Sequence, residues 1–415
     1  MRSLRDESGQ ALVVVALGLT SLLGFIGLAV DVGSLMHNKR ELQVAADAAA
    51  VAAAMSRNAT GYTAAGQNAS SANGFPNGGT VTVTINSTPT SGEYLGQPGY
   101  YEAIIQKTEP TIFMGLFGHG SVPVGARAVA VAQSSNGANT GCVYTLGATG
   151  TDFSLTGNAD VQAPQCGINV DSSDTSAAMS LTGNVTLDAA SIGIVGGYKK
   201  TGNISLTPAS PSTGIVPYSD PLSYLPGYTC TASSCTPSGG GSSISCQAAQ
   251  SITGNQTVTL SPGCYQGLSF GGNSNATLSP GTYIINGSAG LSFSGNNNVS
   301  GSGVTIYIAN GSLSMVGNTV LNLSAPTSGT YLGVLFDQSP SDTSAASLVG
   351  NSGSVIKGVM YFPTASFTLT GNSGTSIYTD FVVSSLSLVG NASFQDYAAL
   401  GGSVTSPLTV VTLVE

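Results

Sequence analysis

The sequence predicts a mainly β protein with a single N-terminal transmembrane helix and helical extension, a small α/β membrane-proximal domain and a C-terminal parallel β-helix. Three observations support this. Twenty uncharged residues lie near the start of the chain. Asp, Glu, Lys and Arg make up only 7% of the 415 residues, against about 25% in ordinary soluble domains. A pentapeptide that ends in Gly-Asn recurs through the second half.

The repeat combines a small hydroxyl residue, an apolar residue, a small residue, glycine and asparagine, as in "SLTGN". Successive asparagines lie 26, 19, 52, 18, 23, 22, 33, 21 and 19 residues apart, so six of nine intervals fall between 18 and 23. In one copy, at Gly202-Asn203, the preceding Lys-Lys-Thr departs from the pattern. The repeat asparagines are Asn158, Asn184, Asn203, Asn255, Asn273, Asn296, Asn318, Asn351, Asn372 and Asn391.

An interval of about twenty residues holds two or three short strands and their bends, which is one coil of a solenoid. We expect coils stacked about 4.8 Å apart, with the apolar residue of each repeat pointing inward. Glycine would turn the corner, and the asparagines would form a ladder along the axis. The predicted β-helix spans residues 140–415, with an excursion at about 208–247 where six prolines interrupt the repeat.

All six cysteines lie in this repeat-bearing part, and their spacing does not match zinc ligation. An even number in a low-charge β protein favours disulfides and an oxidising compartment, with buried free thiols as the alternative. The first two cysteines along the chain are isolated from the others, so a disulfide between them is one option. The remaining four cysteines allow three disulfide connectivities. The candidates are Cys142 and Cys166, then Cys230, Cys235, Cys246 and Cys264.

The uncharged run, Ala11 to Val30, is long enough to cross a hydrocarbon core of about 30 Å as a helix. Basic residues on both sides leave its orientation undecided. The Arg-poor, Cys-bearing body is easier to place outside the cytoplasm, which leaves the N-terminus inside. The apolar run is too long for a signal peptide, and no glycine precedes Glu7 as a type IV prepilin would require.

The helix is expected to continue through the alanine-rich segment from Glu41 to Met55. One stripe collects Leu42, Ala45, Ala46, Ala49, Ala52 and Ala53. Two interpretations stand side by side: a plain helical stalk, or a packing face for a partner helix. We therefore assign residues 1–55 to an anchor and stalk, and residues 56–135 to the small α/β domain.

The stretch from Glu7 to Ala54 resembles the N-terminal domain of TadG-like proteins of the Flp (Tad, type IVc) pilus system. The resemblance lies in Gly9-Gln10, the apolar run that ends "GLAVDVG", the Lys39-Arg40 pair and the closing "QVAADAAA". It implies a bacterial inner-membrane protein of pilus or surface-appendage assembly, with other pilus-assembly proteins as partners. It implies no catalytic residues.

Catalysis and metal binding find little support in the composition. The net charge of −9 argues against nucleic acid. Sugar hydrolysis needs two facing carboxylates. Lyase chemistry usually needs a cationic side chain, but no Arg or His follows residue 127. Trp, which would provide an aromatic platform for a sugar, is absent. Lys199 and Lys200 are expected in a turn, and "DQSPS" from Asp337 is a weak match to a metal signature. By type, the candidate acids are Asp152, Asp160, Asp171, Asp174 and Asp188.

The sequence thus predicts a non-enzymatic, membrane-anchored component of Flp/Tad pilus assembly or surface-appendage presentation, without a cofactor or metal. It would act as an extracytoplasmic binding scaffold, through its neutral Ser/Thr/Asn-rich surface and its alanine-rich helix. It would lie in the bacterial inner membrane as a single-pass protein, its C-terminal part periplasmic or surface-exposed, with self-association left open. The alternative is a surface adhesin or carbohydrate-active β-helix protein.

Overall fold

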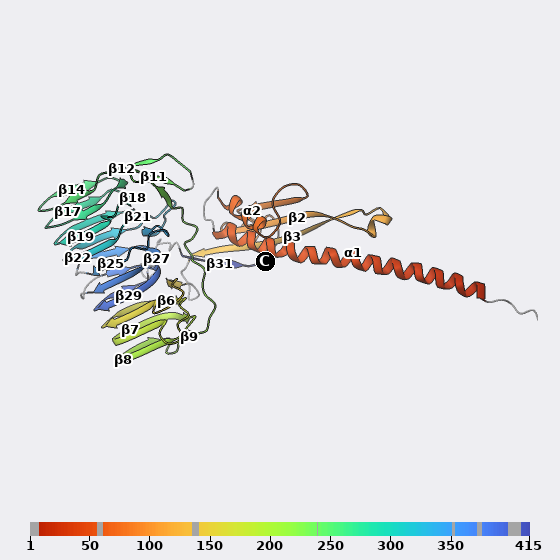
Figure 1. The fold of residues 1–415 in the computed structure, drawn as a ribbon, viewed down its shortest axis with the longest axis horizontal. Helices are drawn as coiled ribbons and strands as arrows, with labels where there is room; N and C mark the ends of the chain where they lie inside the picture. The colour runs from red at the N-terminus through yellow and green to blue at the C-terminus, as the bar shows by residue number, and fades with distance from the viewer. Residues whose placement is uncertain are drawn as a thin grey trace, which may run out of the picture. The chain divides into compact units, whose positions relative to one another are not determined.

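The computed structural model describes residues 8–55, 61–134, 141–238, 240–350, 353–371, 376–396 and 408–415. The chain forms two compact units, one of residues 1–133 and 411–415 and the other of residues 134–410. The structure confirms the predicted fold class: mainly β, with one apolar N-terminal helix and a C-terminal β-solenoid (Figure 1).

The first unit packs two helices against a four-stranded sheet. Its sheet order is β1-β2-β3-β31, in which β1 and β2 as well as β2 and β3 are antiparallel. The β2–β3 ribbon runs beside α1 in Figure 1. The elements are α1 (Ser8–Met55), α2 (Tyr62–Ala72), β1 (Val81–Asn86), β2 (Tyr100–Pro110), the short 3-10 helix η1 (Met114–Phe117), β3 (Ser121–Ser134) and β31 (Thr409–Leu413).

The alanine stripe of α1 is buried against this sheet. Leu42, Ala45, Ala46, Ala49 and Ala53 are fully buried, whereas Ala52 is half-buried. The sheet meets the stripe with small side chains of its own, which lets the helix approach closely: Ala103, Ala126, Ala128 and Ala130. Of the two interpretations, the structure supports a packing face, and its partners lie in the same chain, because both the sheet and α2 pack against α1.

Glu102, on β2, is a fully buried acidic residue of the first unit. The Glu102 carboxylate accepts hydrogen bonds from Asn86, from the backbone and hydroxyl of Thr90, and from Arg127 at 2.6 Å. Arg127 also pairs with Glu415 at 2.7 Å. Burial by itself raises the pKa of Glu102, but hydrogen bonds from Thr90, Asn86 and Arg127 outweigh it, and the net effect lowers the pKa.

The second unit is a parallel β-solenoid with three columns of strands, each column a stacked parallel sheet. The first column contains β12 (Ile244–Gln247), β15 (Gly263–Tyr265), β18 (Gly281–Asn286), β21 (Val304–Asn310), β24 (Val334–Gln338), the starts of β27 (Val359–Gly371) and β29 (Phe381–Gly390), β4 (Gly141–Thr145), the ends of β6 (Asp160–Val170) and β7 (Met179–Ile194), and β9 (Ser212–Thr213).

The second column carries the Gly-Asn corners. It contains β13 (Gln250–Ile252), β16 (Leu268–Phe270), β19 (Leu291–Gly295), β22 (Leu313–Gly317), β25 (Ala346–Gly350), the ends of β27 and β29, β5 (Phe153–Gly157), and the starts of β7 and β8 (Tyr198–Thr207).

The third column closes each coil. It contains β14 (Thr257–Leu260), β17 (Asn275–Leu278), β20 (Asn298–Ser302), β23 (Val320–Ser324), β26 (Val355–Lys357), β28 (Ser376–Tyr378), β30 (Ser393–Gln395), the start of β6, the middle of β7 and the end of β8.

The coils are not stacked in chain order. The chain begins the solenoid at β4–β6, adds β7 and β8 on one side, and then leaves through the excursion. It re-enters at β12 and coils back until β29 and β30 pair with β4, β5 and β6. The last coil is thereby stacked on the first, and the excursion connects the two ends of the stack (Figure 1).

A single apolar core fills the solenoid. The apolar residue of the pentapeptide points inward in successive coils, as at Leu155, Leu181 and Leu388. Aromatic residues stack in the same way, with the Phe270 and Phe293 rings 5.2 Å apart. This repetition of like on like is what the repeat predicts for a β-helix.

Candidate functional site

The N-terminal part of α1 has the properties of a membrane-spanning helix. Val13–Ala54 contains an 18-residue window that is long and apolar enough to cross a membrane, and only 6% of that window is buried. Its side chains are exposed over consecutive turns, including Val14, Leu17 and Phe25. A core helix of a soluble protein would bury such residues, so this segment is suited to a lipid environment.

The turn between β2 and β3 is attached to α1 at the end of the apolar run. The Asp31 carboxylate accepts hydrogen bonds from the backbone N–H groups of Ile112, Phe113 and Met114, at 3.1, 2.8 and 2.6 Å. Four residues earlier, Gly27 leaves room for the Phe113 ring, because a β-carbon there would collide with it. Asp31 and Gly27 together hold the turn against the helix.

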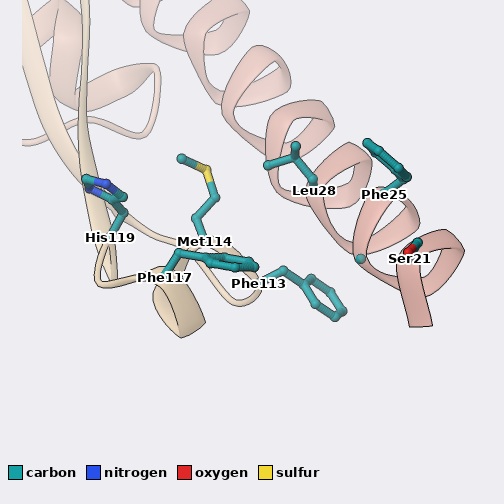
Figure 2. A pocket seen from close by; sticks show the side chains of 8 residues that line it. Ser21, Phe25, Leu28, Phe113, Met114, Phe117 and His119 are labelled. Atoms are coloured by element: carbon teal, nitrogen blue, oxygen red, sulfur yellow. The ribbon is translucent and has the colours of Figure 1, made fainter. Parts of the chain in front are cut away.

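An apolar groove of about 480 Å³ lies between the helix and this turn. Figure 2 shows Phe25 and Leu28 on α1 opposite Phe113, Met114 and Phe117 of the turn. Ser21, Gly24 and His119 complete the lining. The lining is mostly apolar, which suits apolar groups of a lipid or a protein.

Comparison with known proteins gives a match over α1. Residues 9–56 match the family described as putative Flp pilus-assembly TadE/G-like. Over these residues the chain is similar to TadE/G-like proteins. The match coincides with α1 and confirms the resemblance predicted from the sequence. No curated protein and no solved structure matches the chain.

The TadE/G-like domain and the exposed apolar helix together make this a membrane-anchored protein related to Flp pilus assembly. The match ends at residue 56, so the sheet of the first unit and the whole solenoid lie beyond it. Their contribution has to be argued from their own residues.

The repeat asparagines form a ladder on one edge of the solenoid. Asn184 donates to Asn158, and Asn158 donates to Asn391, at 3.1 and 2.9 Å. A second run passes from Asn318 to Asn296, then to Asn273 and Asn255, each at 3.3 Å. Asn203 is in register with Asn184, whereas Asn351 and Asn372 lie outside the described residues.

All six cysteines are paired, as Cys142–Cys166, Cys230–Cys235 and Cys246–Cys264. The last two bonds lie against each other, with the Cys235 sulfur 3.7 Å from that of Cys264 and 4.0 Å from that of Cys246. Cys230–Cys235 closes the hairpin of β10 (Tyr228–Cys230) and β11 (Ser234–Pro237), and Cys246–Cys264 joins β12 to β15 in the first column. The hairpin itself meets the first column through the backbone pairing of β11 with β12.

The excursion packs against the first column and encloses a cleft of about 420 Å³, mostly apolar in its lining, into which a few polar side chains reach. Leu222 is fully buried against Val359 and Val382. In the cleft, the Tyr361 hydroxyl donates to the Asp220 carboxylate at 2.7 Å. Asp337, from β24, and Tyr307 also line it. The cleft brings together two carboxyl groups that lie far apart in the sequence.

Both carboxyl groups of the cleft are held toward their neutral forms. Burial raises the pKa of Asp337 well above its usual range, and nearby Asp220 adds to the shift. Burial likewise raises the pKa of Asp220, against the lowering effect of the hydrogen bond from Tyr361. Protonated carboxyl groups next to tyrosine hydroxyls can donate as well as accept hydrogen bonds, which suits a neutral polyhydroxyl ligand.

The acids named from the sequence are only partly brought together. Asp152 and Asp171 are both buried and interact electrostatically, and burial with the nearby Asp171 raises the pKa of Asp152 to about 7. Asp174 instead caps the backbone N–H groups of Ser176 and Ala177, and Asp160 accepts from Gln162. Asp188 lies half-buried on β7.

Sequence reasoning did not identify Asp220 or Tyr361, and it named Asp31 only as part of the "GLAVDVG" motif, without a role. Asp220 and Tyr361 are joined only through the excursion, and no spacing rule links them. The "DQSPS" segment did contain a cleft residue, Asp337, although its two serines bond each other at 2.9 Å. For Asp31 there was a usable signal, since it is the first charge after the apolar run.

Proposed function

We propose that this protein is a non-enzymatic, membrane-anchored component of Flp/Tad pilus assembly or surface-appendage presentation that serves as an extracytoplasmic binding scaffold. The observation that carries the proposal is the continuity of α1. One uninterrupted helix, Ser8–Met55, includes the apolar segment, the TadE/G-like match and the alanine stripe buried against the sheet. The membrane segment and the first folded unit therefore share one rigid element.

The binding surface of the scaffold is the exterior of the solenoid. From residue 140 onward the chain has three lysines, no arginine and no histidine. Serine, threonine and asparagine side chains that reach the surface alternate with the inward apolar residues along the second and third columns. Such a surface recognises partners through hydrogen bonds and shape rather than through strong charge, so its partners are pilus-assembly proteins with neutral contact faces.

The proposed location is the bacterial inner membrane, with the N-terminus in the cytoplasm and both folded units on the other side. The three disulfides favour an oxidising compartment for the solenoid. Protease added to spheroplasts should remove the solenoid while an N-terminal tag survives. Protection of the solenoid in intact spheroplasts would contradict this orientation.

The scaffold role is tested by deleting the gene and complementing it with the full chain. We expect loss of pili on deletion, restoration on complementation, and recovery of pilus-assembly proteins when the tagged full chain is crosslinked and purified from membranes. Normal piliation in the deletion strain, with no pilus protein crosslinked, would contradict the proposal.

The acidic cleft favours one alternative, a surface adhesin or carbohydrate-active protein. The paired Asp220 and Asp337, next to tyrosines, resemble in type the groups that contact sugars. Full-length protein in detergent is incubated with acidic polysaccharides, beside a D220N/D337N variant. Cleavage products that disappear in the variant would replace the scaffold proposal with an enzymatic function, whereas intact polysaccharide in both supports the scaffold.

A further inference from the structure

We propose that the β2–β3 turn, residues 111–120, is a second membrane contact that inserts among lipid acyl chains beside α1. The proposal depends on α1 crossing the membrane and not on the function in pilus assembly. The turn presents its apolar side chains outward: Ile112 is 74% exposed, Leu116 80% and Phe117 82%. In water, three such side chains at one tip would be unfavourable.

The contacts with α1 set the depth of the turn. Asp31, the first charge after the apolar run, binds its backbone, and Phe113 packs on Gly27, which lies inside the run. At about 1.5 Å per residue, Gly27 lies about 6 Å below Asp31 along the helix. This depth matches the boundary between headgroups and acyl chains, where apolar groups of interfacial segments are buried about 5–10 Å.

The backbone of the turn is prepared for an apolar environment. Irregular backbone enters a bilayer only where its polar groups find partners within the protein. Asp31 accepts from three consecutive N–H groups of the turn. Four more are bonded within it: Thr111 to Gly120, Leu116 to Phe113, Gly118 to Gly115, and His119 to Met114. Seven N–H groups of the turn therefore have partners within the protein.

Charge is distributed as a membrane contact requires. No Asp, Glu, Lys or Arg occurs from Pro110 to Gly120. The next charges along the ribbon, Lys107 and Glu109, pair with each other at 2.7 Å on β2, on the side away from the tip. They would remain in the headgroup layer while the tip lies below it.

Lipid is the occupant that the exposed side chains favour over a protein partner. The groove of about 480 Å³ between Phe25, Leu28 and Phe117 is open and continuous with the exposed apolar face of α1 (Figure 2). Ile112, Leu116 and Phe117 are each more than 70% exposed, so the whole tip needs an apolar surround, which acyl chains supply. Two contacts, the helix and the tip, would fix the rotation of the first unit about the helix axis.

Tryptophan fluorescence tests the insertion directly, because the natural chain contains no Trp. Full-length F117W, with I112W as a second tip variant, is reconstituted into phosphatidylcholine/phosphatidylglycerol vesicles that contain brominated lipids. V15W, in the spanning segment, is the membrane control. L95W, in the exposed connection between β1 and β2 at the opposite end of the ribbon, is the aqueous control.

We expect the tip variants to emit at shorter wavelength than L95W and to lose emission to bromine. Bromine near the headgroup end of the acyl chain should quench them most, whereas V15W should be quenched most by deeper bromine. The proposal would be overturned if the tip variants emitted like L95W and escaped bromine quenching while V15W was quenched. It would also be overturned if a second copy of the chain shielded the tip tryptophans from solvent and lipid, which crosslinked dimers would reveal.

Discussion

The side-chain amide of Asn158 donates to the side-chain oxygen of Asn391 at 2.9 Å, across 233 residues of sequence. This bond joins the first coil of the solenoid to the last. The neighbouring backbone agrees, since Ser154 pairs with Ser387 and Gly157 with Gly390. The side-chain hydrogen bonds run in the same direction on both sides of the junction, from Asn184 to Asn158 and from Asn158 to Asn391. The ladder is therefore continuous across the two chain segments.

Within the Gly-Asn corner, glycine should matter more than asparagine. Gly295 has φ +92°, and a β-carbon there would lie 2.6 Å from the carbonyl oxygen of Gly272 in the next coil. We expect G295A to lower the free energy of unfolding by more than about 2 kcal/mol, because it adds strain and a backbone clash. N296A loses two exposed side-chain bonds and should cost about 1 kcal/mol. Denaturant unfolding of the full chain in detergent, followed by circular dichroism, compares them. Equal costs would contradict this explanation of the repeat.

Lys200 protects one end of the solenoid. It stands in register with Leu181, at the position that is apolar and inward in the coils below. A charge there prevents another strand from adding to the open end. K200L should therefore increase self-association in detergent, measured by sedimentation velocity. K199L is the matched control, because Lys199 is in register with the outward Ser180. The same degree of association in both variants would exclude an end-capping role.

Stability of the solenoid should fall as the pH rises through neutrality, because of Asp152. Its pKa is raised to about 7 by burial and by Asp171, so the folded state binds the proton more tightly than the unfolded state. The stabilisation is complete below the unfolded pKa of about 4 and is lost as the pH rises through about 7, by up to about 1.4 kcal/mol per pH unit. D152N, which resembles the neutral acid, should weaken this dependence in chemical unfolding between pH 5 and pH 8. A wild-type profile retained in D152N would contradict the assignment.

The first unit should respond in the opposite direction. The lowered pKa of Glu102 gives a stabilisation that is present above its unfolded value of about 4.3 and is lost as the pH falls through the folded value. E102Q should therefore destabilise the first unit at pH 7 and weaken its acid dependence. Hydrogen exchange of the β2 amides reports on this unit alone. Unchanged protection of β2 at pH 7 in E102Q would contradict the role of the buried carboxylate.

The sequence predicted which residues align in the solenoid but not the order of its coils. Every repeat offers the same surface, an inward apolar residue followed by Gly-Asn, so the coil with Leu155 can stack on that of Leu388 as well as on that of Leu181. The order is decided by the excursion, whose Leu222 packs on the first column. The expectation that Lys199 and Lys200 lie in a turn is wrong. Both lie on β8, because the strand pattern of the repeat continues through them.

The candidate sites were less predictable than the fold. Asp220 meets Tyr361, and Asp31 meets Phe113, only through tertiary packing between segments separated by 141 and 82 residues. The apolar run and the TadE/G-like match could be identified because they are local and contiguous. The alanine stripe was also visible in the sequence, but a stripe of small residues does not specify whether its partner lies in another chain or in the same one.

The stacking of the last coil on the first is tested most directly by a disulfide. Ser154 and Ser387 are partners across the junction, so the S154C/S387C variant, produced under oxidising conditions, should form a bond that peptide mapping detects. S269C/S292C, which joins two coils that are consecutive in the chain, is the matched control. We predict a crosslink in both variants. A crosslink at 269–292 together with free thiols at 154 and 387 would show that the last coil of the chain is not stacked on the first.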